Sequence, residues 1–190
     1  LQGLMMNTPL VITSIMRFAE RNFPGSGIVS VSDGGTQTCS YAETFRRTRQ
    51  LAHGLRDLGI RPGDRVATLA WNDFRHFEIY YAVSCYGAVC HTVNPRLFPD
   101  QIAYIIDHAE DAWIFADPMF APLLAAIWPR LRSPRGVTFL TDSQGMPDTP
   151  VPSASDYEAL LAGRPDIAAV HAALARALDE HRIARFEPGM

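Results

Sequence analysis

The 190-residue sequence predicts an α/β fold: a mainly parallel sheet flanked by helices, with an N-terminal β-hairpin and a C-terminal helix. The main observation is an alternation of short apolar runs with segments of helical periodicity, joined by short turns. The composition agrees, because 47% hydrophobic and 10% aromatic residues are typical of a globular chain. The expected parallel strands lie near residues 65–70, 88–93, 112–116 and 136–140.

A helix and a hairpin are expected ahead of this sheet. Residues 8–23 carry apolar side chains at helical spacing, and Thr8 followed by Pro9 suits a helix start. Two short β-prone runs then flank Asp33-Gly34-Gly35, which is a strong hairpin signal. The apolar residues at this helical spacing are Leu10, Ile12, Ile15, Met16, Ala19 and Phe23.

The segment "SYAETFRRTRQLAHGLRDLG" predicts a long helix with clear start and stop signals. Ser40 followed three residues later by Glu43 forms a capping box, and Gly59 suits the left-handed position after a helix end. Three arginines on this helix are interpreted as a solvated face beside Glu43, and these are Arg46, Arg47 and Arg49.

The segment "DFRHFEIYYAVSCYG" predicts an aromatic-rich helix that begins at Asn72 or Asp73 and ends at Gly87. It carries His76 and Glu78 among aromatic residues. Such a pattern fits either a core-facing stripe or a cofactor box, and the core stripe is the favoured interpretation.

The C-terminal part divides into a loop, a short helix and a tail. Residues 142–155 are rich in Pro, Ser and Asp and predict a surface loop, and "DYEALLAG" predicts a short helix. The composition becomes Ala- and Arg-rich after Arg164, so we expect one domain over residues 1–164 and a divergent helical tail over 165–190. The apolar positions at helical spacing in the tail are Ile167, Val170, Leu174 and Leu178.

Charge and composition argue against several classes of protein. The net charge of -3 and the pI near 6.1 give no basic footprint for nucleic acid. No apolar run approaches the length of a membrane span, and the first residues lack the basic region of a signal peptide. Three sparse cysteines are expected to be reduced thiols of a cytoplasmic protein.

The chain contains no lysine, since all 17 basic Lys and Arg positions are arginine. Mechanisms that need an ammonium group, such as a phosphate-loop lysine or a Schiff base, are closed to these residues alone. The motifs of Rossmann, P-loop, serine-hydrolase and zinc-protease sites are absent from the sequence. Residues 107–111 group polar side chains, but a solvated helix end is favoured over a metal site.

Residues 91–98 are the best candidate for a site. The strand expected to end at Val93 is followed by Asn94, Pro95 and Arg96, at the edge where parallel sheets bind ligands. Arg96 can meet a phosphate or carboxylate with two hydrogen bonds. The alternative is a stiff connector in which the next two residues staple the following helix, namely Leu97 and Phe98.

The run "RPGDRVATLAWN", followed by "HFE", "YYAVS", "GAVCHTVNPRLFP" and "HAED", resembles the N-terminal part of AMP-forming acyl-CoA synthetases. The similarity is greatest to the medium- and long-chain fatty-acid ligase branch, which includes methylmercaptopropionate ligases, and covers about residues 1–164. The resemblance implies the N-terminal subdomain of the adenylate-forming ligase fold. It also implies a reaction in which Mg-ATP activates a carboxylic acid that then passes to coenzyme A.

The resemblance places Asn94, Pro95 and Arg96 at the rim of the crevice by which coenzyme A approaches. The family's phosphate loop, magnesium-binding glutamate, ribose-binding aspartate and catalytic lysine lie downstream of the matched part. The family uses ATP, Mg and coenzyme A, but no cofactor is expected for this chain alone.

Three hypotheses follow for the function. The first is a truncated ligase fragment that is inactive alone, the second is half of a split ligase, and the third is a non-catalytic binding or regulatory module on the same fold. The expected partner is the missing ligase subdomain or a second copy of the chain, since apolar surface meant for burial would otherwise stay exposed.

Overall fold

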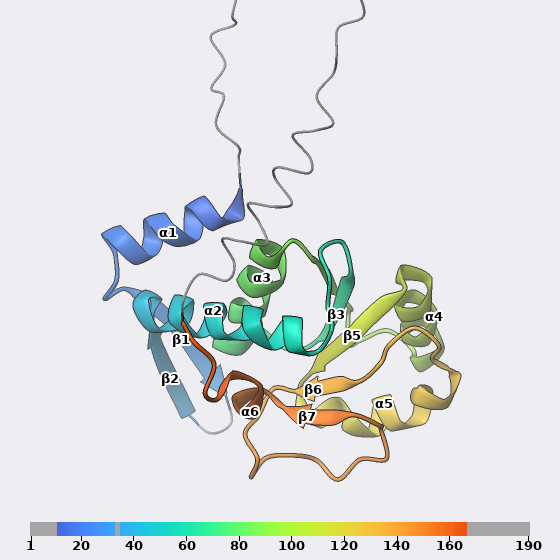
Figure 1. The fold of residues 1–190 in the computed structure, drawn as a ribbon. Helices are drawn as coiled ribbons and strands as arrows, with labels where there is room; N and C mark the ends of the chain where they lie inside the picture. Colours follow the sequence, from blue (N-terminus) through green and yellow to red (C-terminus); the bar gives the residue numbers. More distant parts are fainter. Residues whose placement is uncertain (1–10, 33–34, 167–190) are drawn as a thin grey trace, which may run out of the picture.

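The computed structural model describes residues 11–32 and 35–166 and contains a five-stranded sheet with the order β4-β3-β5-β6-β7 (Figure 1). Each neighbouring pair of strands in this sheet is parallel. The predicted α/β fold and its four parallel strands are therefore confirmed. The strands are β3 (Arg65–Leu69), β4 (Val89–Thr92), β5 (Asp111–Ala116), β6 (Val137–Phe139) and β7 (Ala154–Asp156).

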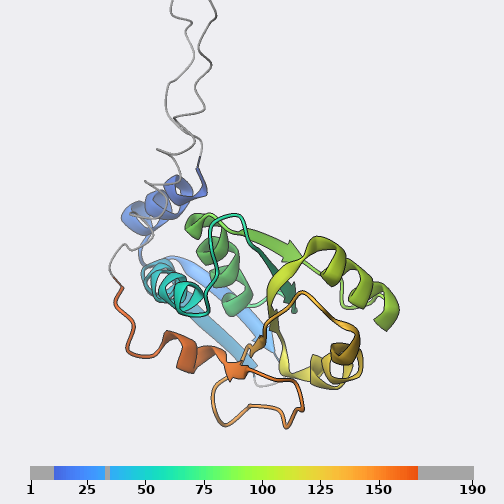
Figure 2. The same cartoon turned by 45° about the vertical axis from the view of Figure 1, so that its right-hand side comes forward.

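Helices cover both faces of the sheet, and each face has its own apolar core (Figures 1 and 2). Alternate residues of β5 divide between them, because Phe115 packs in one core and Ile114 in the other. The first core is closed by α2 (Tyr41–Asp57), α3 (Phe74–Tyr86) and α6 (Tyr157–Leu161), and the second by α4 (Pro99–Ala109) and α5 (Ala121–Ile127). Short 3-10 turns, Pro118–Phe120 and Trp128–Arg130, flank α5.

The predicted start and stop residues of α2 and α3 lie at the helix ends, but only the Ser40 half of the predicted capping box forms, because the Glu43 carboxylate accepts hydrogen bonds from Arg46. The Ser40 side chain accepts a hydrogen bond from the Glu43 backbone N–H, and Asp73 accepts one from the His76 N–H. Gly59 has φ +74° and Gly87 has φ +91°, a left-handed conformation that glycine adopts without strain. These local interactions fix the ends of both helices, and Asp73 is the cap of the second.

Helix α1 (Ile12–Asn22) begins after Val11, while Thr8, Pro9 and Leu10 lie outside the described residues. The predicted helix is therefore present, and of its apolar side chains Met16 is buried, whereas Ile12 and Ile15 are 46% and 57% exposed. The helix contacts α2 and α3. No other described element covers its remaining apolar side chains.

The predicted hairpin is present as β1 (Gly27–Ser32) and β2 (Gly35–Ser40), and Asp33 and Gly34 lie outside the described residues. The interpretation of residues 142–155 as surface loop needs a correction at its end, because Ala154 and Ser155 begin β7, which pairs with β6. The short predicted helix is α6. The predicted helical tail lies outside the described residues from 167 onward.

Candidate functional site

Three loops meet where β3, β4 and β5 end, and we call their residues Trp71, Asn94, Arg96, Asp117 and Met119 the carboxyl edge. Trp71 donates its backbone N–H to Asp117 Oδ2 at 2.7 Å and its indole N–H to Met119 Sδ at 3.0 Å. The Arg96 guanidinium lies 5.8 Å from the centre of the Trp71 ring. The structure thus brings together residues that are up to 48 positions apart in the sequence.

The predicted corner after β4 is a tight turn. Asn94 Oδ1 accepts a hydrogen bond from the Arg96 N–H at 3.0 Å, and the Asn94 carbonyl accepts one from Leu97 N–H at 3.3 Å. Pro95 is half-buried, and Leu97 packs against the core. Phe98 caps α4 but is 76% exposed, so the stapling hypothesis holds for Leu97 and is wrong for Phe98.

The carboxyl edge is suited to hold an anion. Arg96 is exposed and, among the described residues, its guanidinium has no carboxylate partner. Stacking on Trp71 orients a guanidinium without using its N–H donors. Burial raises the pKa of Asp117, although the hydrogen bond from Trp71 opposes this rise. The edge therefore presents one oriented cation at the loops where open α/β sheets bind ligands.

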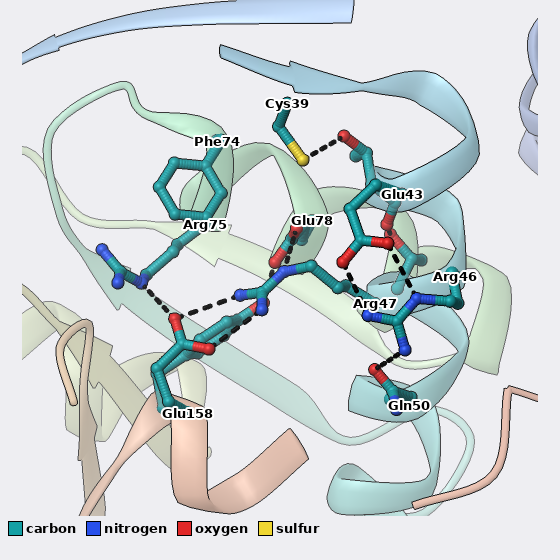
Figure 3. Close-up of polar contacts among 12 residues, drawn as sticks. Cys39, Glu43, Arg46, Arg47, Gln50, Phe74, Arg75, Glu78 and Glu158 are labelled. Atoms are coloured by element: carbon teal, nitrogen blue, oxygen red, sulfur yellow. Dashed lines mark hydrogen bonds and ion pairs between the residues drawn. The ribbon is translucent and has the colours of Figure 1, made fainter. Parts of the chain in front are cut away.

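A second polar group, which we call the charge cluster, joins α2, α3 and α6 (Figure 3). It consists of Arg47, Arg75, Glu78, Tyr157 and Glu158. Arg47 donates to Glu78 Oε1 at 2.8 Å and to both carboxylate oxygens of Glu158 at 2.9 and 3.1 Å. Arg75 donates to Glu158 Oε1 at 2.9 Å, and the Tyr157 hydroxyl donates to Glu78 Oε2 at 2.8 Å.

In the charge cluster Glu78 and Tyr157 are buried and the other three residues are half-buried, which corrects the interpretation of Arg47 as part of a solvated helix face. The same correction applies to Arg49, whose side chain is 18% exposed and pairs with Glu20. The side chain of Arg47 is 14% exposed and that of Glu78 is 0% exposed. Burial raises the pKa of Glu78 to about 7, while hydrogen bonds from Arg47 and Tyr157 oppose the rise. The pKa of Glu158, in contrast, is lowered. Burial acts to raise it, but the hydrogen bonds and charges of Arg47 and Arg75 have the larger effect.

A third polar pair, His91 and Asp111, lies between β4 and β5. His91 Nδ1 is 2.7 Å from Asp111 Oδ2, and Asp111 is fully buried, so this residue is not part of a solvated turn. Burial raises the pKa of Asp111 to about 6, against the effect of His91. Within residues 11–32 and 35–166, no group of three His, Cys, Asp or Glu side chains could hold a metal ion.

Sequence reasoning missed Tyr157 and Glu158 entirely and placed Glu78 only in an apolar stripe. These residues come from helices that are distant in the sequence: Arg47 and Glu158 are 111 positions apart. The only available signal was a carboxylate within an aromatic-rich helix that is expected to face the core, since a buried charge requires a partner. That signal does not identify the partner.

The chain belongs to the AMP-binding enzyme family, whose model matches residues 18–182. It is 50% identical over 126 residues to a 3-methylmercaptopropionyl-CoA ligase of Ruegeria lacuscaerulensis, covering 66% of this chain and 23% of that one. It is 41% identical over 161 residues to a medium-chain-fatty-acid–CoA ligase of Ectopseudomonas oleovorans, covering 84% and 29%. The chain spans about a quarter of the length of these relatives.

Solved structures of adenylate-forming ligases share the fold. An anthranilate CoA ligase in complex with anthranoyl-AMP superposes with a TM-score of 0.71 at 18% identity, covering 84% of this chain and 30% of that one. A benzoate CoA ligase from Burkholderia xenovorans gives a TM-score of 0.66 at 18% identity, covering 82% and 29%. The fold is therefore shared by ligases whose named acids differ.

Proposed function

We propose that residues 1–164 form the N-terminal subdomain of an AMP-forming acyl-CoA ligase and that the 190 residues do not form acyl-adenylate alone. The observation that carries this proposal is the family match together with 50% identity to a 3-methylmercaptopropionyl-CoA ligase. The assembled ligase would use ATP, Mg and coenzyme A in the cytoplasm. Its substrate would be an aliphatic or methylthio-substituted carboxylic acid, as the names of the relatives suggest.

The absence of lysine supports inactivity of the chain alone. Phosphate chemistry requires preorganised cations or donors for the charge that develops on the transferred group. The sequence contains neither a lysine nor a P-loop motif. Arg47 and Arg75, which could otherwise bind a phosphate, are committed to the carboxylate of Glu158. The cations and donors that phosphate chemistry requires must therefore come from residues other than Arg47 and Arg75.

Exposed apolar side chains support a large covering partner. Val29 and Val31 on the outer side of the hairpin are 63% and 80% exposed, and Phe18 on α1 is 60% exposed. Exposed apolar surface on a folded domain is typical of regions that another part of the protein covers. The remaining subdomain of the ligase is the partner we propose, and Asn94, Pro95 and Arg96 would lie at the coenzyme A side of the completed site.

The experiment compares the 190-residue chain with a fusion of its residues 1–164 to the remaining part of the Ectopseudomonas ligase. Each protein is given Mg-ATP, coenzyme A and either a medium-chain fatty acid or 3-methylmercaptopropionate, and pyrophosphate release is measured. We expect turnover from the fusion alone. Turnover by the 190 residues would contradict the proposal, as would a folded fusion that is inactive with both acids. Activity on mixing the chain with the separate remainder would support the split-ligase hypothesis.

A further inference from the structure

Residues 157–166, which we call the strap, consist of α6 and the segment that follows it up to the last described residue, Asp166. The strap lies along α2. The strap is short, and α6 has only five residues, so its own helical hydrogen bonds provide little stability. Its attachment must therefore come from side chains of other elements. The structure shows these contacts at both ends of the strap.

At the α6 end, Glu158 lies in a clamp formed by two arginines. Arg47 of α2 contacts both of its oxygens, and Arg75 of α3 contacts one of them. Both guanidiniums also lie over the ring of Phe74, at 5.6 and 4.7 Å from its centre. Such bidentate charge-assisted hydrogen bonds are strong and directional, so the clamp fixes both the position and the rotation of α6.

At the far end, polar side chains of α2 hold the backbone of the strap. The Gln50 amide donates to the Arg164 carbonyl at 2.9 Å, and Arg49 donates to the Asp166 carbonyl at 2.7 Å. Arg49 also pairs with Glu20 of α1. These contacts hold backbone atoms, so they fix the course of the chain whatever side chains the strap carries.

The middle of the strap packs very closely on α2. A Cβ at Gly54 would lie 2.8 Å from Leu160 Cγ, which is closer than real Cβ contacts come. Gly54 is in the interior of a helix, where glycine is unfavourable without a packing reason. The close approach of Leu160 supplies that reason and shows that α2 and the strap are fitted to each other.

We infer that the two-arginine clamp on Glu158 is a positioning device: it sets the course of the strap and thereby the place from which the ligase chain continues after Asp166. This inference rests on the proposed function. Glu158 and Arg47 are then positioning residues for the completed nucleotide site, since the groups for phosphate chemistry must follow from outside the described residues.

Hydrogen exchange on the 190-residue chain tests the strap independently of catalysis. In Glu158→Gln the buried Arg47–Glu78 pair is kept, while the carboxylate in the clamp is lost. We expect the amides of Ala162 and Arg164 to exchange about tenfold faster, which corresponds to a loss of about 1.4 kcal/mol in local stability, with no change in β3. The matched control is Glu110→Gln, which removes the charge of a 78% exposed partner of Arg65. It should change the exchange rates of neither the strap nor β3. Unchanged strap exchange in Glu158→Gln would overturn the inference.

The same two substitutions in the ligase fusion test the positioning role. We expect Glu158→Gln to raise the KM for ATP about tenfold with a smaller change in kcat, because a misplaced chain populates the binding-competent arrangement less often. Glu110→Gln should leave both constants unchanged. Faster strap exchange together with an unchanged KM would overturn the positioning role. An inactive parent fusion would contradict the proposed function, while the exchange experiment would still decide whether the clamp holds the strap.

Discussion

The charge cluster and the carboxyl edge are both polar, but they differ in their partners. The carboxylates of the charge cluster are hydrogen-bonded within the described residues, whereas the carboxyl edge presents an exposed guanidinium to solvent. In the charge cluster, every oxygen of Glu78 and Glu158 accepts a hydrogen bond from a described residue. At the carboxyl edge, Arg96 is exposed and stacks on Trp71, which is itself 44% exposed. One region therefore stabilises this subdomain, while the other still has donors to offer.

The ionisable groups of this chain with the most strongly shifted pKa values therefore need not lie at its functional site. Shifted pKa values favour a functional assignment only as a probability, because buried structural ion pairs shift them too. The pKa of Glu78 is raised to about 7, yet its carboxylate is enclosed by Arg47 and Tyr157. The expected effects of substitutions differ accordingly between the two regions.

The largest effect is expected for Arg47→Met, which would break the charge cluster. The change leaves Glu78 buried without its cation, so the free energy of unfolding at pH 8 should fall by about 3–5 kcal/mol. Urea unfolding monitored by circular dichroism measures this change. Arg56→Met is the matched control, because Arg56 is on the same helix and 61% exposed, and it should change stability by less than about 0.5 kcal/mol. Equal effects of the two substitutions would show that the cluster is not stabilising.

The next effect is a pH dependence caused by Glu78. Its pKa is raised from 4.5 to about 7 on folding, so the folded state keeps a proton that the unfolded state releases. The stabilising contribution of this group is fully present below pH 4.5 and is lost as the pH rises through about 7. The free energy of unfolding should therefore fall by about 3 kcal/mol between pH 4.5 and 8.

The variant Glu78→Gln should lose most of this dependence, which unfolding curves across the pH range would show. Asp111, whose pKa is raised to about 6, keeps a contribution of the same sign in both proteins. Glu158 acts in a lower window, because its lowered pKa makes its stabilisation disappear as the pH falls below 4.5. An unchanged pH profile in Glu78→Gln would contradict the assignment to Glu78.

A smaller effect is expected where α2 meets the strap. Gly54→Ala improves helix propensity by about 1 kcal/mol but places a Cβ against Leu160, so a net loss of about 1–3 kcal/mol is expected. The double variant with Leu160→Ala removes the clash, and a thermodynamic cycle of the four proteins should show a favourable coupling between the two changes. A stabilised Gly54→Ala protein would mean that the strap is not closely packed on α2.

The smallest effect is expected at the carboxyl edge. Arg96→Gln removes an exposed cation–π contact with Trp71, which contributes less than about 1 kcal/mol, and the buried charge cluster is untouched. Thermal unfolding of the 190-residue chain should detect little change, while the KM of the ligase fusion for coenzyme A should rise. A large loss of stability with an unchanged KM for coenzyme A would show that Arg96 stabilises the fold and does not contribute to binding.

The sequence alone predicts strands β3 to β6 and the ends of α2 and α3, but not β7, which lies where the composition predicts a loop. Short apolar runs bounded by turn residues predict strands, and the capping by Ser40 and Asp73 involves backbone atoms within three residues. The left-handed turns at Gly59 and Gly87 are equally local. The corner at Asn94 to Arg96 was predicted from the proline that follows Asn94, which is also a local effect. The hydrogen bond from the Arg96 N–H to Asn94 Oδ1 is seen in the structure.

Which charged residues are buried, and which apolar residues stay exposed, depends on the tertiary structure. Arg47 resembles its neighbour Arg46 in the sequence, but Arg46 is 40% exposed, whereas the direction of Arg47 on α2 brings it to Glu78 and Glu158. Asp111 is buried because β5 is an interior strand, where His91 of β4 reaches it. Burial depends on what other elements cover, and for Ile12 and Ile15 of α1 no described element provides that cover.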